Sequence, residues 1–286
     1  MLTLGGFGFL LACVFGTYII EGGSIGVLVE ALPFEMITIG GAAAGSFVMA
    51  NGMHEVRNTI GGAMHAIRGS SYRKTDYIEL LTLLYALIRL AATKGTMALE
   101  PHIEKPEDST LFQRVPRILA KAHVRDMICD YLRIVGMNAD DPHQIEDIMA
   151  RELKKRLAED LHPSHALQNM SDGLPALGIV AAVLGVIKTM SHIDQPPSVL
   201  GGMIGAALCG TFLGVLLAYG LVGPVACRIR MVVEEDAKFY EVIRAVLVTH
   251  LHGNAPQVSV ESGRKMVPTH LMPTFQELEE ALQAAT

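Results

Sequence analysis

Two long, almost uncharged stretches in the middle of this 286-residue chain carry the few features there that could do chemistry. Residues 174–193 carry a proline, Pro175, near their start, and residues 199–226 carry another, Pro224, near their end. The second stretch also holds a hydroxyl, Thr211, at a mid-stretch position. A proline frees a backbone carbonyl and can form a joint in a membrane helix, and a hydroxyl can line a hydrated path. Neither stretch contains a carboxylate, so if this pair conducts ions, another chain must supply the titrating group.

Each of these features also has a plain structural explanation. Thr211 could donate to a carbonyl of its own helix, as a lone membrane threonine usually does. The two prolines could simply mark helix starts or kinks. Glu35 is the carboxylate nearest to a membrane position, and we expect it at the entrance of another apolar stretch, residues 33–50, near the outer surface. The sequence therefore predicts no ionisable carrier at mid-membrane depth.

Four apolar stretches must position these residues. Half of the chain is hydrophobic, its mean hydropathy is +0.36, and charged residues still make up 18%, so a membrane protein with a large soluble part is expected. At about 1.5 Å of rise per residue, each stretch can cross a hydrocarbon core of about 30 Å. The first lacks a basic leader and a cleavage pattern, so we interpret it as a retained span. The stretches are residues 2–20, 33–50, 174–193 and 199–226.

The 23 Lys and Arg residues predict the orientation. Residues 51–170 hold 16 of them and the tail from residue 228 onward holds 6, whereas the connectors 21–32 and 194–198 hold none. Both large segments and both termini should therefore be cytoplasmic. The predicted division is residues 1–50 for spans 1 and 2, 51–170 for a cytoplasmic helical domain, 171–227 for a channel-lining hairpin of spans 3 and 4, and 228–286 for a cytoplasmic helix and tail.

The cytoplasmic part shows helix signals and almost no strand pattern. Thr75 and Ser109 are candidate helix starts, and Asp141 followed by Pro142 is another. An all-α fold is therefore expected. The sequence shows no Cys or carboxylate pattern around the His pairs 162/165 and 250/252 that is typical of a metal site, so we predict no metal or other cofactor. Without a phosphate loop, a nucleophile elbow or a basic patch interleaved with aromatics, the sequence indicates neither an enzyme nor a nucleic-acid binder.

Several long motifs resemble the MotA family of flagellar stator proteins, within the wider group that includes ExbB and TolQ. The resemblance extends over essentially the whole chain. The motifs are GLPALGIVAAVLGV at 173–186, GTFLGVLLAYGLVGP at 210–224, PRILAKAHVRDMICDYLR at 116–133, VESGRK at 260–265 and PTFQELEEAL at 273–282.

The resemblance implies an ion channel made with a single-span, MotB-like partner whose membrane aspartate carries the ion. It also implies a ring of five such chains around two partner chains. Pro175 and Pro224 would couple protonation to movement, and Thr211 would line the path. Ala182 and Gly210 stand where sodium-driven relatives are expected to have threonines. Because those oxygens are missing, protons are the expected coupling ion and sodium is disfavoured.

The resemblance further implies a charged cytoplasmic surface that contacts FliG, the rotor switch-complex protein. Glu100 and Glu104 match its acidic part. The arginine expected eight residues before Glu100 is missing, because Ala92 stands there. Lys94 or Arg89 is the expected substitute.

We therefore predict a stator subunit of the bacterial flagellum, a multi-pass protein of the inner membrane that couples proton flow to torque for motility. One alternative is an ExbB/TolQ-like subunit that energises an envelope process through the same kind of channel. Another is a passive membrane scaffold, held together by glycines four residues apart, such as Gly41 and Gly45, Gly201 and Gly205, and Gly210 and Gly214.

Overall fold

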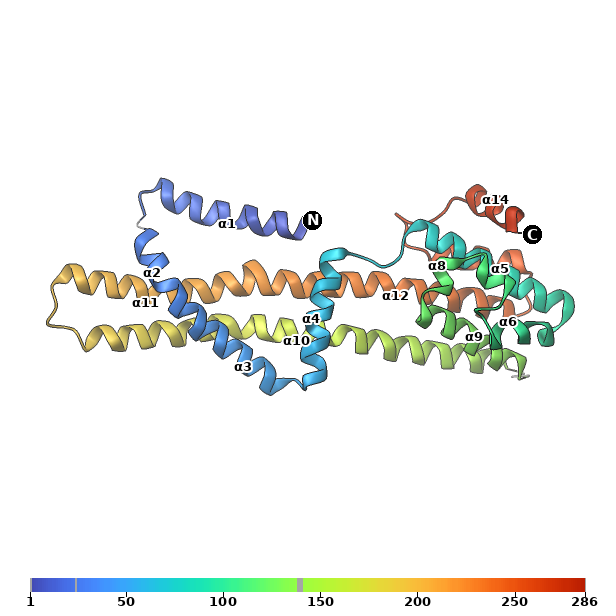
Figure 1. The fold of residues 1–286 in the computed structure, drawn as a ribbon, viewed down its shortest axis with the longest axis horizontal. Helices are drawn as coiled ribbons and strands as arrows, with labels where there is room; N and C mark the ends of the chain where they lie inside the picture. The colour runs from blue at the N-terminus through green and yellow to red at the C-terminus, as the bar shows by residue number, and fades with distance from the viewer. Residues whose placement is uncertain (1, 24, 138–140, 286) are drawn as a thin grey trace. The chain divides into compact units, whose positions relative to one another are not determined.

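In the computed structural model, which describes residues 2–23, 25–137 and 141–285, every regular element is a helix (Figure 1). The predicted all-α class is confirmed. The chain divides into two compact units, each made of two segments. We call Met1–Gly69 with Asp160–Val232 the apolar unit, and Ser70–Glu159 with Val233–Thr286 the charged unit. Two long helices, α10 and α12, contribute residues to both.

The apolar unit is built from helices that carry the predicted membrane stretches. Its π-helical segments lie at Met36–Gly40 and Ala218–Val222, each continuing directly into the next α-helix. The α-helices that contribute to this unit are α1 (Leu2–Ile20), α2 (Ile25–Glu35), α3 (Gly41–Ala50), α4 (Met53–Arg68), α10 (Pro142–Met190), α11 (Pro197–Leu217) and α12 (Gly223–Leu251).

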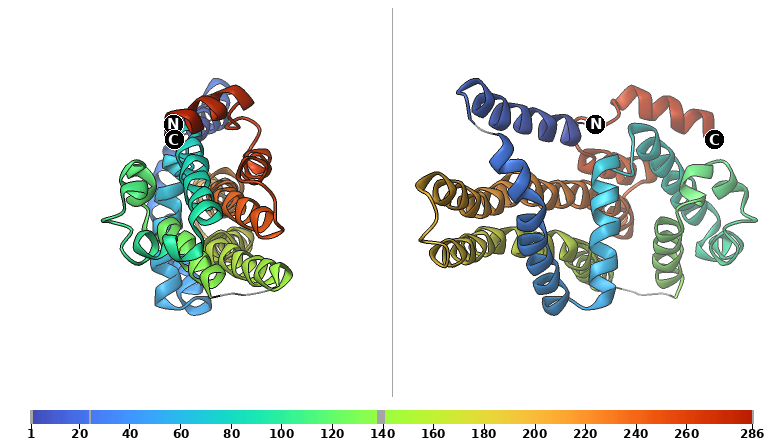
Figure 2. Two further views of the ribbon diagram at one scale, coloured as in Figure 1. Left: turned by 90° about the vertical axis from the view of Figure 1, so that its right-hand side faces the viewer. Right: turned by 60° about the vertical axis from the view of Figure 1, so that its left-hand side comes forward.

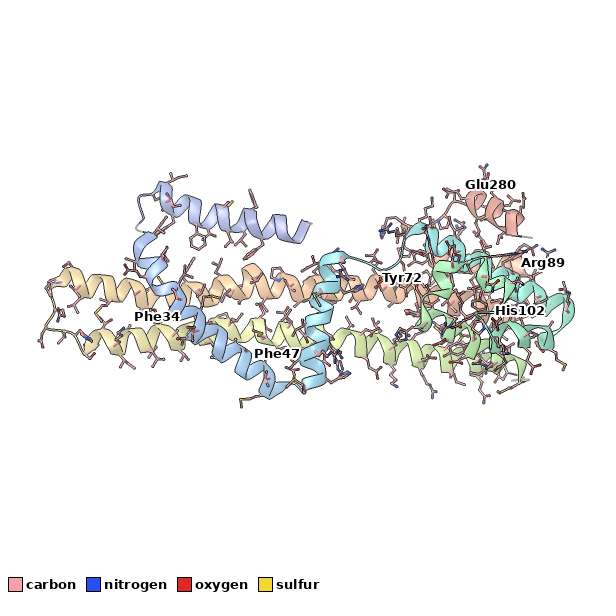
Figure 3. All side chains as sticks on the ribbon, in the orientation of Figure 1. Phe34, Phe47, Tyr72, Arg89, His102 and Glu280 are labelled. Carbon is pink, nitrogen blue, oxygen red and sulfur yellow. The ribbon has the colours of Figure 1, made fainter. Side chains whose placement is uncertain are left out.

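Among the described residues, three continuous helical stretches are long and apolar enough to cross a membrane, namely Ile25–Ala50, Pro142–Met190 and Pro197–Leu251. The N-terminal helix is apolar too, but its described apolar stretch, Gly5–Ile20, is shorter than a full span. The exposed surface of these helices is rich in large apolar side chains, such as Phe34 on α2, which is 74% exposed and labelled in Figure 3. Such a surface suits lipid or neighbouring apolar helices.

The predicted start of the second stretch is wrong. We expected residues 21–32 to be an outer connector and residues 33–50 to be the span, but α2 already begins at Ile25. Pro33 lies inside the helix rather than at its start, and α2 packs against α11 along the connector's expected length. Residue 24 of that connector lies outside the described residues. The helix is extended by apolar residues that precede Pro33.

A second correction concerns α10. The sequence suggests a cytoplasmic helix from residue 142 and a separate span from residue 174, but the structure has one helix of 49 residues. Pro163 and Pro175 both lie inside it. A proline removes one intrahelical hydrogen bond, and packing against neighbouring helices can offset that loss. The prolines are therefore interior joints of one helix.

Glycines bring the backbones of α10 and α11 together, and the two helices lie side by side in every view (Figures 1 and 2). A Cβ added to Gly214 would lie 2.7 Å from the Leu174 carbonyl oxygen and 2.9 Å from the Gly178 Cα. Gly185 meets Ala207 in the same way. Small residues permit such close approach of membrane helices.

Only part of the predicted glycine pattern serves this packing. Gly210 and Gly214 lie at the contact between α10 and α11, whereas a Cβ on Gly41, Gly45 or Gly201 would meet no described atom within 4 Å.

The charged unit has its own apolar core around α5. Leu80, Leu84 and Leu87 of this helix are fully buried, together with Phe112 and Phe239 from other helices. Burial of each such side chain contributes roughly 1.5–3 kcal/mol. Besides parts of α10 and α12, the unit contains α5 (Lys74–Lys94), a 3₁₀ turn (Thr96–Leu99), α6 (Glu100–Glu104), α7 (Thr110–Gln113), α8 (Pro116–Leu119), α9 (Ala122–Gly136), α13 (Pro256–Met266) and α14 (Phe275–Ala285).

Candidate functional site

The two predicted joint prolines are linked through one serine. Pro175 has no N–H, so the carbonyl of Ser171, four residues earlier, loses its intrahelical donor. The Ser171 hydroxyl donates a hydrogen bond of 2.9 Å to the Ala218 carbonyl. Ala218 opens the π-helical segment that ends just before α12, where Pro224 is the second residue. A single buried side chain therefore connects the two helical irregularities. The sequence analysis did not single out Ser171.

Thr211 does not follow the usual behaviour of a membrane threonine. Thr17, Thr38 and Thr189 each donate to the carbonyl four residues earlier, at 2.7–2.9 Å. Thr211 makes no such bond within the described residues, and it is half-buried on α11. Its hydroxyl is therefore free to meet a group from outside the described chain.

Ala182 and Gly210, the two positions that bear on ion choice, touch each other. A Cβ on Gly210 would lie 3.1 Å from the Ala182 backbone nitrogen. Thr211 follows Gly210 on α11, and its Cα would lie 3.3 Å from a Cβ on Gly178. The structure therefore brings Ala182, Gly210 and Thr211 into one layer of the contact between α10 and α11. Of these three residues, only Thr211 offers a side-chain oxygen.

Glu35 belongs to the same layer, which the sequence analysis did not predict. Its Oε2 atom lies 2.9 Å from the position of a Cβ on Gly210. That oxygen is buried and has no hydrogen-bond partner among the described residues. The prediction that Glu35 sits at the entrance of a span is wrong, because α2 begins ten residues before it.

The acidic residues of the predicted rotor contact lie on α6 in the charged unit. Glu100 is exposed, and Glu104 accepts a hydrogen bond of 2.6 Å from Arg133 of α9. Arg133 also bonds the Ile103 carbonyl at 3.0 Å. The hydrogen bond that Arg133 donates to Glu104 raises the pKa of Arg133. Glu104 is therefore held by an ion pair within the chain, and Glu100 is the less restrained of the two acids.

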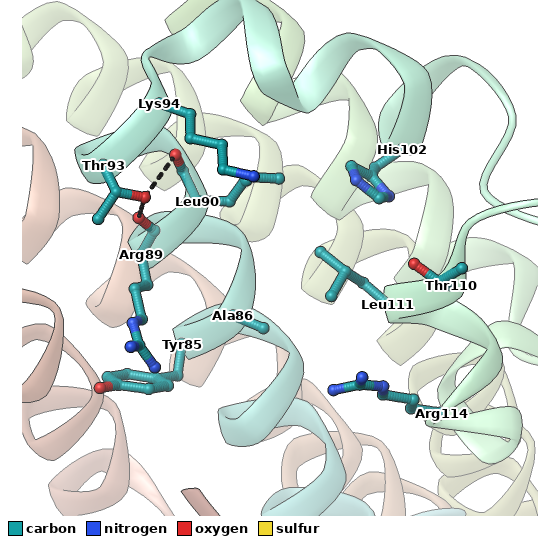
Figure 4. Close-up of a pocket in the computed structure, with 10 residues that line it drawn as sticks. All are labelled: Tyr85, Ala86, Arg89, Leu90, Thr93, Lys94, His102, Thr110, Leu111 and Arg114. Carbon is teal, nitrogen blue, oxygen red and sulfur yellow. Dashed lines mark hydrogen bonds between the residues drawn. The ribbon is translucent and has the colours of Figure 1, made fainter. Parts of the chain in front are cut away.

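The basic residues lie around a separate hollow of about 370 Å³ (Figure 4). Arg89 and Lys94 of α5 line it together with Arg114, which follows α7. The Arg89 guanidinium lies 6.0 Å from the centre of the Tyr85 ring. Glu100 and Glu104 instead line a hollow of about 320 Å³ with Arg133. The structure thus places the predicted acids and bases around two hollows of the charged unit, and Ala92 is exposed between Arg89 and Lys94 on α5.

Comparison with known proteins decides the family. A family model for the N-terminal part of motility protein A matches residues 4–95, and one for the MotA/TolQ/ExbB proton channel family matches residues 113–241. The chain is 39% identical to motility protein A of Salmonella typhimurium over 284 residues, which cover 99% of this chain and 96% of that protein. The chain belongs to the motility protein A family. The family and the general function predicted from its motifs are confirmed.

Two solved structures support the fold of this motility protein A family member. The structure of MotAB from C. jejuni has a TM-score of 0.74 at 16% identity, covering 96% of this chain and 98% of that one. The flagellar MotAB stator complex from Bacillus subtilis has a TM-score of 0.69 at 22% identity, covering 97% of this chain and 98% of that one.

In this motility protein A family member, three charged residues without a predicted role lie close to the predicted site residues. Arg133 ends the motif at 116–133, so its place in a family signature was a usable signal. Arg114 lies two residues before that motif and had no comparable signal. Glu35 was noticed, but its depth depended on where α2 begins.

Proposed function

We propose that this chain is a flagellar stator subunit that forms a proton path with a MotB-like, single-span partner. The observation that supports this most strongly is the layer of Ala182, Gly210 and Thr211, where a membrane hydroxyl is left without a partner in its own helix. Neither α11 nor the apolar part of α10 supplies a carboxylate there. A membrane aspartate on the partner would meet Thr211 and carry the ion.

The proposed topology has four spans in the inner membrane, with both termini cytoplasmic. Three helices meet the length and composition of a span, and α1 is the fourth apolar helix. The basic residues fall outside the two short connectors, as the positive-inside rule requires. In this topology, the charged unit is the cytoplasmic part, and Pro175 and Pro224 lie towards the cytoplasmic ends of the spans.

We favour a proton as the coupling ion and a closed ring of five chains as the assembly. Ala182 and Gly210 place no side-chain oxygen beside Thr211, so the chain offers few ligands for sodium. The exposed apolar surface of the helical stretch Ile25–Ala50, including Ile37 at 73% and Met49 at 90%, suits neighbouring copies as well as lipid. The MotAB complexes that share this fold support a partner and self-association.

The proposed output is torque on FliG through the charged unit. Glu100 would supply the acidic contact, with Glu104 held behind it by Arg133. Arg89, Lys94 and Arg114 would supply the basic contact. Partner charges at exposed positions act through screened electrostatics, so the contact should weaken as ionic strength rises.

The experiment that tests this function is motor rotation in cells that lack their own stator genes and carry this chain with its partner. Collapsing the proton gradient should stop rotation, and collapsing the sodium gradient should leave it unchanged. Rotation that depends on sodium would overturn the proton assignment. Normal assembly with no ion dependence would favour a passive scaffold, and ion dependence without rotation would favour an envelope process of the ExbB and TolQ kind.

A further inference from the structure

Glu35 lies in the middle of an apolar helical stretch, where an ionisable side chain is expensive. It is ten residues from the start of α2 at Ile25, or about 15 Å along the helix. Gly210 is thirteen residues from the start of α11, or about 20 Å, and Ala181 is nine residues from the end of α10, or about 14 Å. These three positions therefore share one depth, near the centre of a hydrocarbon core of about 30 Å.

The surroundings of Glu35 keep one of its oxygens unpaired. Oε2 is buried without a hydrogen-bond partner in the described part of the chain, and it fills the space that a side chain at position 210 would take. Gly210 thus makes room for the carboxylate. Ionisable residues kept at such a depth usually serve ion or proton movement, because their burial costs stability.

This carboxylate lines a cavity of about 400 Å³, which in the proposed topology lies in the outer half of the helices. Glu30 and Glu35 line it from α2, and Lys188 and Thr189 line it from α10. Glu30 and Lys188 are exposed, whereas Thr189 is 5% exposed. The titratable groups that face Glu35 are therefore Glu30 on its own helix, Lys188 on α10 and the Cys209 thiol on α11.

We propose that Glu35 is a protonatable group of the ion path that this chain itself supplies, upstream of the carboxylate of the partner. The inference rests on the proposed function as a proton path. Glu35 would accept a proton from hydronium in the cavity, which becomes water, and would hold it as the neutral acid. It would then pass the proton across the layer of Gly210 and Thr211 to the carboxylate of the partner, and would become ionised again.

The test is proton flux through the complete complex, reconstituted with its single-span partner in lipid vesicles under an imposed membrane potential, with an internal pH dye. Glu35→Gln keeps the volume and hydrogen-bonding capacity but cannot titrate, so flux should fall by at least about tenfold, since a positioned proton-transfer group contributes roughly 100-fold or more. Glu35→Asp should retain most of the flux. The amount of complex recovered with the partner should be unchanged in both.

The outcomes separate this inference from the proposed function. If the Glu35→Gln complex carries the same proton flux as the wild type, the role of Glu35 is overturned and the proposed function stands. A wild-type complex that carries no potential-driven proton flux would overturn both. Equal loss in Glu35→Gln and Glu35→Asp, with normal recovery of the complex, would show that the site needs the shape of glutamate rather than its proton, and would also overturn the inference.

Gly210→Ala provides an independent variant, with Gly201→Ala as its matched control on α11. A Cβ at position 210 would displace the Glu35 carboxylate and would also lie 3.1 Å from the Ala181 Cβ and the Ala182 nitrogen, so recovery of the complex is measured together with its flux. A Cβ at position 201 would meet no described atom within 4 Å. Gly210→Ala should lower flux in the wild-type background by at least about tenfold and add little to Glu35→Gln. Gly201→Ala should stay within about twofold of wild type. Effects of Gly210→Ala and Glu35→Gln that simply multiply would contradict the proposal.

Discussion

The Ser171 hydroxyl donates a hydrogen bond of 2.9 Å to the Ala218 carbonyl, and both residues are buried. This bond joins the turn of α10 that precedes Pro175 to the π-helical segment that precedes Pro224. Movement at either proline must therefore stretch, break or carry along the same hydrogen bond. We therefore predict that this pair couples movement at the two prolines.

Removing this bond should impair rotation more than its energy alone suggests. Ser171→Ala loses a net hydrogen bond worth about 1 kcal/mol, and Ser164→Ala loses a similar buried bond, from Ser164 to the Ala226 carbonyl at 2.9 Å. Thermal unfolding of the detergent-solubilised complex should shift by a similar amount in both variants. Only Ser171→Ala should slow the motor severalfold. Equal motor speeds in the two variants would show that the Ser171 bond contributes only stability.

Pro175→Ala should abolish motility while the complex still assembles. Alanine restores the N–H that can bond to the Ser171 carbonyl, so it straightens and stiffens α10 at the joint. Assembly is measured by recovery of the chain with its partner from membranes, and function by swimming. Pro163→Ala is the matched control on the same helix, and it should leave swimming near normal. Loss of assembly in Pro175→Ala would reduce this proline to a structural residue.

Glu100→Lys should reduce torque, and a charge reversal on the rotor should restore part of it. Glu100 is exposed and lies at the start of α6, where its charge can reach another protein. The measurement is the speed of tethered cells that carry each combination of stator and rotor charges. Complete indifference of the speed to the rotor charge would exclude this residue from the contact.

The helical fold was predictable from the sequence because long apolar stretches are local signals. The family was predictable because its motifs are long continuous runs of sequence. The start of α2 and the continuity of α10 were not, since Pro33 and Pro175 look like boundaries until neighbouring helices are known to pack there. The role of Gly210 as space for the Glu35 carboxylate depends on residues 175 positions apart in sequence. Such long-range contacts leave no periodic trace in either segment.

The VESGRK motif was recognised at the sequence level, but its physical role became clear only from the fold. Arg264 is 6% exposed and donates to Glu261 at 2.7 Å and to the Pro273 carbonyl at 2.9 Å. It thereby ties α13 to the segment that leads into α14. The hydrogen bond from Arg264 lowers the pKa of Glu261 below its usual value of 4.5.

Acid should therefore loosen the C-terminal segment. Because the folded pKa of Glu261 is depressed, its stabilising contribution is complete above about pH 4.5 and is lost as the pH falls through the folded value. The protection factors of residues 267–285, which correct hydrogen exchange for its intrinsic pH dependence, should fall severalfold in Glu261→Gln at pH 7, and in the wild type only as the pH falls below 4.5 through the folded pKa of Glu261. Glu279→Gln is the control, since it changes an exposed carboxylate of α14 and should change exchange little near Arg264. Slow exchange that persists in Glu261→Gln would show that the Arg264 bond to Pro273 holds this segment without the carboxylate.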